Sequence, residues 1–206
     1  MSRPKIDMAP EVFAKAIEWA AHFKRRGTQG ELNLAGIGES TMHPHFIRYL
    51  RFAREALGED QRIVLATNGL LVDRAMAEAM APYRPEVWVS LHRPEKAGPA
   101  IEELKRVDLL RGVSADPSVQ AVDWAGQVKW HVSTVLKGSP CMWLNTGSVF
   151  VMSDGSVTQC CFDGTGTGTF AHVNDDLTRH VTGPYRLCAT CHHSTGIGVE
   201  KQRTWG

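Results

Sequence analysis

The first 140 residues of the chain contain no cysteine, and all five cysteines lie from Cys141 onward. Five in 206 residues is far below the density of a disulfide-stapled secreted domain. No stretch reaches the roughly 18 apolar residues that a membrane-spanning helix needs, and the amino terminus lacks the apolar core of a signal peptide. We therefore expect a cytoplasmic protein with no membrane partner.

An excess of charge of one sign is also absent. Lysine and arginine number 23 against 22 aspartates and glutamates, a formal net charge of +1, so the sequence gives no strong signal for nucleic acid. Hydrophobic residues make up 43% and charged residues 22% of the chain. This composition excludes intrinsic disorder, and the length is sufficient to bury a core.

Residues 1–115 alternate between helical and strand patterns. Apolar residues at spacings of three and four predict helices over 10–26, 44–58, 72–81 and 98–111, and short apolar runs predict strands over 31–37, 62–66 and 86–91. Strands separated by helices form parallel sheets with right-handed crossovers. An eight-unit barrel needs about 250 residues, so we expect an α/β fold with a partial, open TIM-like barrel.

Residues 116–206 differ in character. Helical periodicity fades after Gly112, and Asp154-Gly155 between two short apolar runs predicts a β-hairpin. The region holds too little periodic apolar sequence for an independent core, and it contains all the cysteines. We expect a small, loop-rich second domain that is cross-linked by a metal centre.

The cysteines offer a complete set of four thiolates for a zinc ion or an iron–sulfur cluster, with one to spare. Zinc sites usually draw on two Cys-x-x-Cys pairs or on histidine, whereas this chain has one such pair, Cys188 and Cys191. His192 and His193 follow that pair and could serve as ligands, although a solvated turn is the commoner role. The alternative is buried thiols at Cys160 and Cys161 beside a coincidental pair.

The arrangement of these cysteines resembles the SPASM-type auxiliary-cluster region of radical S-adenosylmethionine (SAM) enzymes. That pattern is a cysteine, a hairpin ending in G-x-x-x-x-C, and a closing C-x-x-C; Trp124-Ala125-Gly126 is similar to the W-A-G segment that often precedes it. The resemblance implies one 4Fe–4S cluster held by Cys141, Cys160, Cys188 and Cys191, with Cys161 as a doubtful fifth.

The amino-terminal region resembles the same superfamily. Gly36-Ile-Gly38-Glu39-Ser40 is similar to the G-G-E-P motif, in which backbone and glutamate contact the methionine amino group of SAM; the family's proline is Ser40 here. Thr67-Asn68-Gly69 is similar to the T-N-G turn of the next strand, and Ser90 to a SAM-contacting position one strand further. The implied SAM site comprises Gly36, Gly38, Glu39, Ser40, Thr67, Asn68 and Ser90.

The C-x-x-x-C-x-x-C loop that holds the SAM-bound cluster in this superfamily has no counterpart in the sequence. Three explanations are open. Met1 is internal to a longer protein, which we favour because the SAM-contact motifs are retained; the chain is a relic that keeps the auxiliary cluster; or the loop comes from a separate polypeptide.

The resemblance implies an oxidoreductase that cleaves SAM reductively and abstracts hydrogen from a substrate, with catalytic residues unknown. We expect a peptide or protein substrate, with a small molecule or nucleoside as alternatives, and an external electron donor. The competing interpretation is a non-catalytic iron–sulfur or zinc protein acting as a binding or electron-transfer module. Five tryptophans are interpreted as packing residues: Trp19, Trp88, Trp124, Trp130 and Trp143.

Overall fold

The computed structural model describes residues 6–25, 27, 30–36, 38–91, 93–114, 141, 147–176, 180–182, 187–188 and 203–205. The chain divides into two compact units, Ala20–Gln120 and Met1–Trp19 together with Ala121–Gly206. The sequence predicts a boundary between residues 115 and 116, whereas contacts assign the first 19 residues to the carboxyl-terminal unit.

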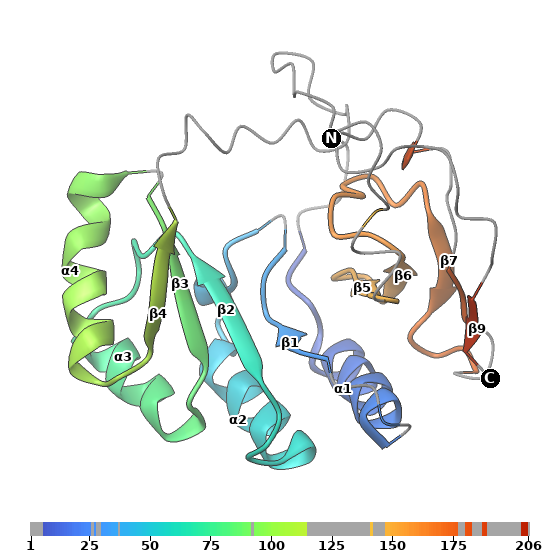
Figure 1. Cartoon of the computed structure of the whole chain (residues 1–206), viewed down its shortest axis with the longest axis horizontal. Helices are drawn as coiled ribbons and strands as arrows, with labels where there is room; N and C mark the ends of the chain where they lie inside the picture. The colour runs from blue at the N-terminus through green and yellow to red at the C-terminus, as the bar shows by residue number, and fades with distance from the viewer. Residues whose placement is uncertain are drawn as a thin grey trace. The chain divides into compact units, whose positions relative to one another are not determined.

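The unit Ala20–Gln120 contains a four-stranded parallel sheet (Figure 1). Its strands follow chain order: β1 (Leu32–Asn33), β2 (Ile63–Thr67), β3 (Glu86–Ser90) and β4 (Leu110–Ser114). The crossovers contain α2 (Phe46–Leu57), α3 (Arg74–Met80) and α4 (Pro94–Arg106), with short 3₁₀ helices η1 (Ser40–Met42) and η2 (Ala81–Tyr83).

The strand order determines where the helices lie. Successive right-handed crossovers that always advance in one direction place every helix on the same face of the sheet, and α2, α3 and α4 do share one face (Figure 1). A doubly wound sheet would reverse direction and place helices on both faces. The unit is therefore an α/β fold of the partial TIM-like kind.

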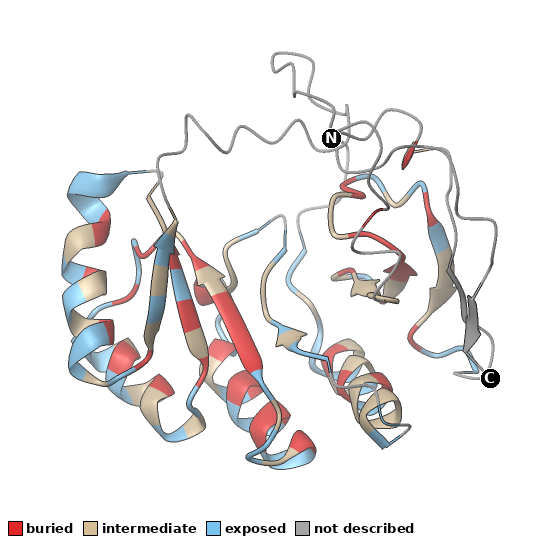
Figure 2. Cartoon of the chain, viewed as in Figure 1, coloured by how far each residue is buried: buried red, intermediate tan, exposed pale blue. Residues whose placement is uncertain are grey.

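Burial along β3 shows the two faces of the sheet (Figure 2). Val87 and Val89 are 0% exposed because they point toward the helices, and Trp88 between them is 42% exposed. Trp88 as a packing residue is therefore a wrong prediction. Its side chain lies on the face that α2, α3 and α4 leave uncovered.

One strand prediction and one helix prediction need correction. The strand predicted over 31–37 is only Leu32–Asn33, because the chain then turns into the loop that leads to η1. The helix predicted over 98–111 begins at Pro94 and ends at Arg106, and Leu110 opens β4. Asp108, in the left-handed region at φ 56°, makes the turn between them. The prediction extended the helix through Leu109 and Leu110 because a short apolar run fits a helix and a strand equally well.

Helix α2 has one buried side, formed by Phe46, Tyr49, Leu50, Ala53 and Leu57. Arg54 on the same helix is 5% exposed, and its hydrogen bonds within the described part of the chain go to backbone carbonyls. Its guanidinium donates to the oxygens of Tyr83 (2.9 Å), Gly58 (2.9 Å), Glu59 (3.2 Å), Gln61 (2.7 Å) and Arg84 (3.4 Å). One side chain thus ties the two loops that lead into β2 and β3.

The carboxyl-terminal unit contains an antiparallel sheet of β5 (Phe150–Val151), β6 (Ser156–Thr158) and β7 (Thr169–His172). A second antiparallel pair joins β8 (His180–Thr182) to β9 (Arg203–Trp205). The predicted hairpin is confirmed: β5 and β6 turn through Asp154 and Gly155, whose φ of 88° favours glycine.

Helix α1 (Pro10–Arg25) contributes its first turns to this unit. Trp19 is 2% exposed and donates from its indole nitrogen to the Val173 carbonyl at 3.1 Å, which confirms it as a packing residue. Trp124, Trp130, Trp143 and the segment Val122–Gly126 lie outside the described residues.

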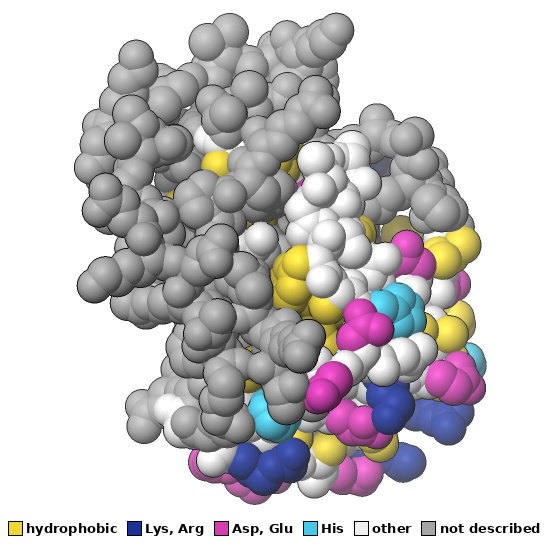
Figure 3. Space-filling model, turned by 90° about the vertical axis from the view of Figure 1, so that its right-hand side faces the viewer, with side chains coloured by type: hydrophobic (Ala, Val, Ile, Leu, Met, Phe, Trp, Pro, Cys, Tyr) yellow, Lys and Arg dark blue, Asp and Glu magenta, His cyan; other side chains and the backbone are white. Residues whose placement is uncertain are grey.

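None of the described helices combines the length and apolar character that crossing a bilayer requires. Acidic and basic side chains are interspersed over the described part of the face in Figure 3, in keeping with the balanced charge count.

Replacing Arg54 with methionine should lower the free energy of unfolding by about 3 kcal/mol, because several partly buried carbonyls lose a charged donor. Arg51→Met is the matched control, since Arg51 lies on the same helix in an exposed 3.5 Å pair with Glu55; its effect should stay within about 0.5 kcal/mol. Urea unfolding measures both, and equal losses would refute the anchoring role of Arg54.

Candidate functional site

The carboxylate of Glu39 joins two loops at the carboxyl ends of β1 and β2. Glu39 caps η1, where its Oε1 accepts from the Thr41 backbone nitrogen (3.2 Å) and hydroxyl (2.7 Å). The same oxygen accepts from the Thr67 hydroxyl at 2.9 Å, and Oε2 accepts from the Asn68 backbone nitrogen at 2.8 Å. The glutamate motif and the T-N-G turn, 28 residues apart, are therefore in direct contact.

Thr67 and Asn68 shape the second loop. The buried Thr67 hydroxyl accepts from the Gly69 nitrogen at 3.1 Å, and the Asn68 side chain accepts from the Leu70 nitrogen at 2.9 Å. Gly69 adopts φ 75°, with Val89 and Ala100 close to the place of a Cβ. The T-N-G sequence thus makes a tight turn whose backbone faces Glu39.

Ser90 ends β3 at the same edge of the sheet. Thr67 pairs with Val89, so Ser90 lies one residue beyond that pair, at the level of Asn68. Ser90 pairs in turn with Ser114, whose hydroxyl accepts from the Leu91 nitrogen at 3.3 Å. Carboxyl ends of parallel strands are where ligands bind in barrels and open α/β sheets.

The remaining predicted positions lie in the loop before η1. The Ser40 hydroxyl donates to the Leu34 carbonyl at 2.7 Å and so holds the loop in place. Gly36 and Gly38 are exposed. A Cβ at Gly38 would meet nothing within 4 Å, and its φ lies outside the left-handed region. Neither packing against the described residues nor φ requires glycine there, and the exposed backbone is open to close approach.

The donor count on Glu39 shows what this arrangement can bind. Among the described residues, Oε1 receives three donors and Oε2 one. A carboxylate oxygen has about two acceptor sites, so Oε2 can take a further donor. An ammonium group supplies such a donor, and its charge strengthens the bond.

Cys160 follows β6 in a turn built around its sulfur. The Phe162 backbone nitrogen donates to Cys160 Sγ at 3.4 Å, and the Thr158 hydroxyl donates to the Cys160 carbonyl at 3.1 Å. An N–H directed at sulfur stabilises a thiolate and is one of the contacts that tune iron–sulfur clusters. Local geometry at Cys160 therefore suits a metal ligand.

Asp163 fixes the loop after this turn, a role that sequence analysis missed. Its carboxylate is fully buried and accepts from the backbone nitrogens of Thr167 (2.9 Å) and Gly168 (2.6 Å). Its own nitrogen donates to the Cys160 carbonyl at 3.1 Å. An aspartate ahead of the alternating Gly and Thr residues was the available signal.

The predicted cluster ligands are described only in part. Cys141, Cys160 and Cys188 are buried, Cys161 is half-buried, and Cys191 lies outside the described residues, as do His192 and His193. Within the described part of the chain, no three His, Cys, Asp or Glu side chains gather closely enough to hold a metal ion. The four-cysteine ligand set stays a prediction.

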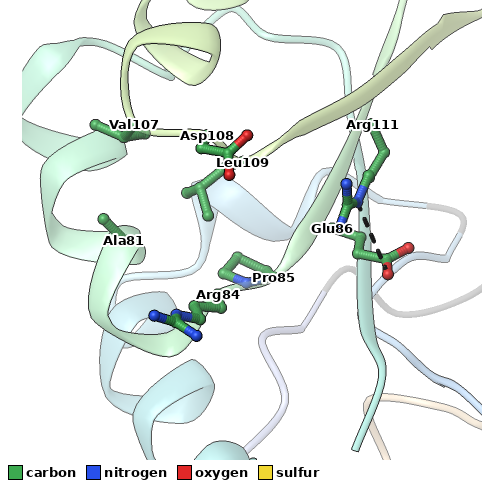
Figure 4. Close-up of a pocket in the computed structure, with 8 residues that line it drawn as sticks. All are labelled: Ala81, Arg84, Pro85, Glu86, Val107, Asp108, Leu109 and Arg111. Atoms are coloured by element: carbon green, nitrogen blue, oxygen red, sulfur yellow. Dashed lines mark ion pairs between the residues drawn. The ribbon is translucent and has the colours of Figure 1, made fainter.

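A pocket of about 490 Å³ opens at the other end of the sheet, where β3 and β4 begin (Figure 4). Glu86 and Arg111 form one wall, where Arg111 Nε lies 3.8 Å from Glu86 Oε1. Arg84 lies on the opposite wall. The hydrogen bond from Arg62, aided by the charges of Arg62 and Arg111, holds the pKa of Glu86 below its ordinary value. None of the predicted site residues lines this pocket, and the amino-terminal face of a barrel usually serves stability.

Comparisons with known proteins give the fold. No family model matches the chain, and no curated protein matches its sequence. The crystal structure of BtrN in complex with AdoMet and 2-DOIA is similar, with a TM-score of 0.66, 13% identity, and coverage of 83% of this chain and 68% of BtrN. Selenomethionine BtrN in an open conformation gives a TM-score of 0.57 and 14% identity over 82% of this chain and 64% of that one.

The chain thus spans about two thirds of the length of BtrN, a radical SAM enzyme. At such low identity the likeness shows the fold alone. It confirms a radical SAM-like α/β fold with a parallel four-stranded sheet. The SPASM-type character of the cysteine region is not tested and stays a prediction.

Thr67→Val should lower the free energy of unfolding by about 1–2 kcal/mol, because Glu39 loses a donor and the Gly69 nitrogen an acceptor. Thr67→Ser, which keeps the hydroxyl, should recover most of the loss. Urea unfolding gives the energies, and amide hydrogen exchange should show faster opening at Asn68 and Gly69 in the valine variant alone. Equal behaviour of the two variants would contradict the bridging role of this hydroxyl.

Proposed function

We propose that the chain carries the SAM site and the auxiliary-cluster region of a radical SAM/SPASM-type oxidoreductase. The observation that carries the proposal is the contact of the Glu39 carboxylate with the Thr67–Asn68 turn at the carboxyl edge of a singly wound parallel sheet. BtrN, which shares this fold, was crystallised with AdoMet. Bound SAM would supply, on reductive cleavage, the hydrogen-abstracting chemistry of this class.

The residues at this edge suit the two ends of a SAM molecule. The remaining acceptor site of Glu39 Oε2 would receive the methionine ammonium group, and the exposed backbone at Gly36 and Gly38 admits a ligand at close range. Asn68 and Ser90, level with each other on adjacent strands, offer polar groups further along the edge. The Ser40 hydroxyl holds the loop before η1 in place through its hydrogen bond to the Leu34 carbonyl.

The carboxyl-terminal unit would hold one 4Fe–4S cluster on Cys141, Cys160, Cys188 and Cys191. The N–H directed at Cys160 Sγ and the burial of Cys141 and Cys188 fit cluster ligands. Such a cluster supplies electron transfer or substrate positioning. The same proposal includes a peptide or protein substrate, with a small molecule or a nucleoside as alternatives. It also includes an external electron donor and a cytoplasmic location.

A second candidate is a non-catalytic iron–sulfur or zinc protein. The sequence feature that favours it is the lack of any cysteine before Cys141, because the radical chemistry needs a cluster held by three cysteines near the SAM site. Treating the anaerobically reconstituted protein with dithionite and SAM distinguishes the two candidates. Formation of 5′-deoxyadenosine and methionine supports the enzyme, and SAM binding without cleavage supports the non-catalytic protein.

SAM titrated into the full chain by calorimetry tests the proposed site. Glu39→Gln removes the charge and should raise the dissociation constant about tenfold or more. Gly38→Ala should raise it similarly while leaving the melting temperature unchanged, because the methyl group has open space. Glu55→Gln, at an exposed pair on α2, is the matched control. Binding of equal strength to the Glu39 variant and the control would refute the assignment.

Cysteine variants test the cluster. Cys188→Ala should abolish the brown absorbance of anaerobically reconstituted protein, because a ligand is lost, whereas Cys161→Ala should retain most of it. Iron and zinc analysis of the same samples identifies the metal. Equal iron loss in the two variants would contradict this ligand set, and zinc in place of iron under anaerobic conditions would favour the second candidate.

A further inference from the structure

Asp163 is a fully buried acidic residue in the loop that joins β6 to β7, and the proposed function gives it no role. An aspartate is rarely buried unless partners stabilise its charge. Here Oδ1 accepts from the Thr167 nitrogen at 2.9 Å, and Oδ2 accepts from the Gly168 nitrogen at 2.6 Å. Two oxygens that both accept are the hydrogen-bonding pattern of an ionised carboxylate. The loop therefore keeps a negative charge away from solvent.

This charge lies close to Cys160. The Asp163 nitrogen donates to the Cys160 carbonyl at 3.1 Å and so closes a four-residue turn, whose first and last Cα atoms lie within about 7 Å of each other. Inside the turn, the Phe162 nitrogen donates to Cys160 Sγ at 3.4 Å. The backbone of Asp163 thus shapes the turn that directs an N–H at the sulfur.

The side chain of Asp163 holds the same turn from the other side. Residues 159–168 connect β6 to β7, which are paired neighbours in the sheet. Through Thr167 and Gly168, Asp163 binds the two residues that directly precede β7. Hydrogen bonds to a charged acceptor are stronger than neutral ones. One residue therefore joins the turn at Cys160 to the far end of the loop.

A buried charge at this place would act on a cluster bound to Cys160. Salt and water screen a buried charge much less than an exposed one. The reduction potential of an iron–sulfur cluster depends on the charge around it and on the hydrogen bonds to its sulfurs. A negative charge opposes the addition of an electron, so the carboxylate of Asp163 would lower the potential.

We propose that Asp163 is a positioning residue for the auxiliary cluster: it holds Cys160 in its turn, and its buried charge lowers the reduction potential of the cluster. This inference rests on the proposed function. In the redox step one electron leaves the donor, which is oxidised, and enters the cluster, which is reduced; no atom is transferred. The charge of Asp163 makes this electron uptake less favourable, so that only a strong donor reduces the cluster.

The test compares Asp163→Asn with the wild-type full chain, both reconstituted anaerobically with iron and sulfide. Asparagine keeps the size and one acceptor oxygen but removes the charge. At a fixed solution potential the ratio of reduced to oxidised cluster should rise about tenfold, which is about 59 mV for one electron. A dithionite titration with redox dyes, followed by electron paramagnetic resonance, measures this ratio.

Asp154→Asn is the matched control. Asp154 also accepts from a backbone nitrogen, that of Ser156 at 2.9 Å, but its side chain is exposed in the β5–β6 turn. Solvent and salt screen its charge, so the ratio should stay at the wild-type value.

Each outcome decides the proposal. A raised ratio at wild-type iron content in Asp163→Asn alone supports it, whereas an unchanged or lowered ratio, or an equal rise in Asp154→Asn, overturns it. If Asp163→Asn takes up less iron, the melting temperature of the iron-free chain decides: an unchanged value places the effect at the cluster ligand and supports the proposal, and a lower value shows a purely structural role and overturns it. Failure of the proposed cluster itself is distinct, because the wild-type chain would then take up no iron.

Discussion

The carboxylate of Glu39 is the contact on which the carboxyl edge of the sheet depends. The carboxylate accepts hydrogen bonds from both loops, so it fixes the position of each loop relative to the other. A charged acceptor with several donors holds its loops more firmly than neutral pairs do, and it retains a site for one more donor. The same atom group can therefore order the unliganded loops and contribute to binding.

Singly wound topology explains why this edge is available. All three helices of the sheet cover one face, and in a closed barrel the other face would be filled by side chains from the opposite strands. With four parallel strands the interior face instead presents Trp88, beside Ala66 and Gly112. Trp88 is therefore partly exposed on this face, and its register partners on the neighbouring strands are small.

The parallel α/β fold could be predicted because periodicity and element order are local signals. Glu39, Thr67 and Asn68, which the structure brings into contact, stand out in the sequence because their motifs are contiguous. The helix prediction includes Leu110 because a short apolar run fits both structures, and the deciding turn at Asp108 has no strong signal. The exposure of Trp88 cannot be read from the sequence, because it depends on which face of the sheet the crossovers cover. Asp163 and Arg54 were missed because their partners are backbone atoms of neighbouring loops, which no residue pattern encodes.

The reliance of Arg54 on main-chain oxygens has a consequence for how the protein tolerates change. Every residue supplies the same carbonyl, so Tyr83, Glu59 and Gln61 can be exchanged for other side chains without removing an acceptor from the guanidinium. Arg54 itself cannot be exchanged in this way, because a shorter side chain, or one with a single ammonium group, cannot bind both loops at once. Substitutions should therefore be tolerated in the loops and not at Arg54, the helical residue that binds them.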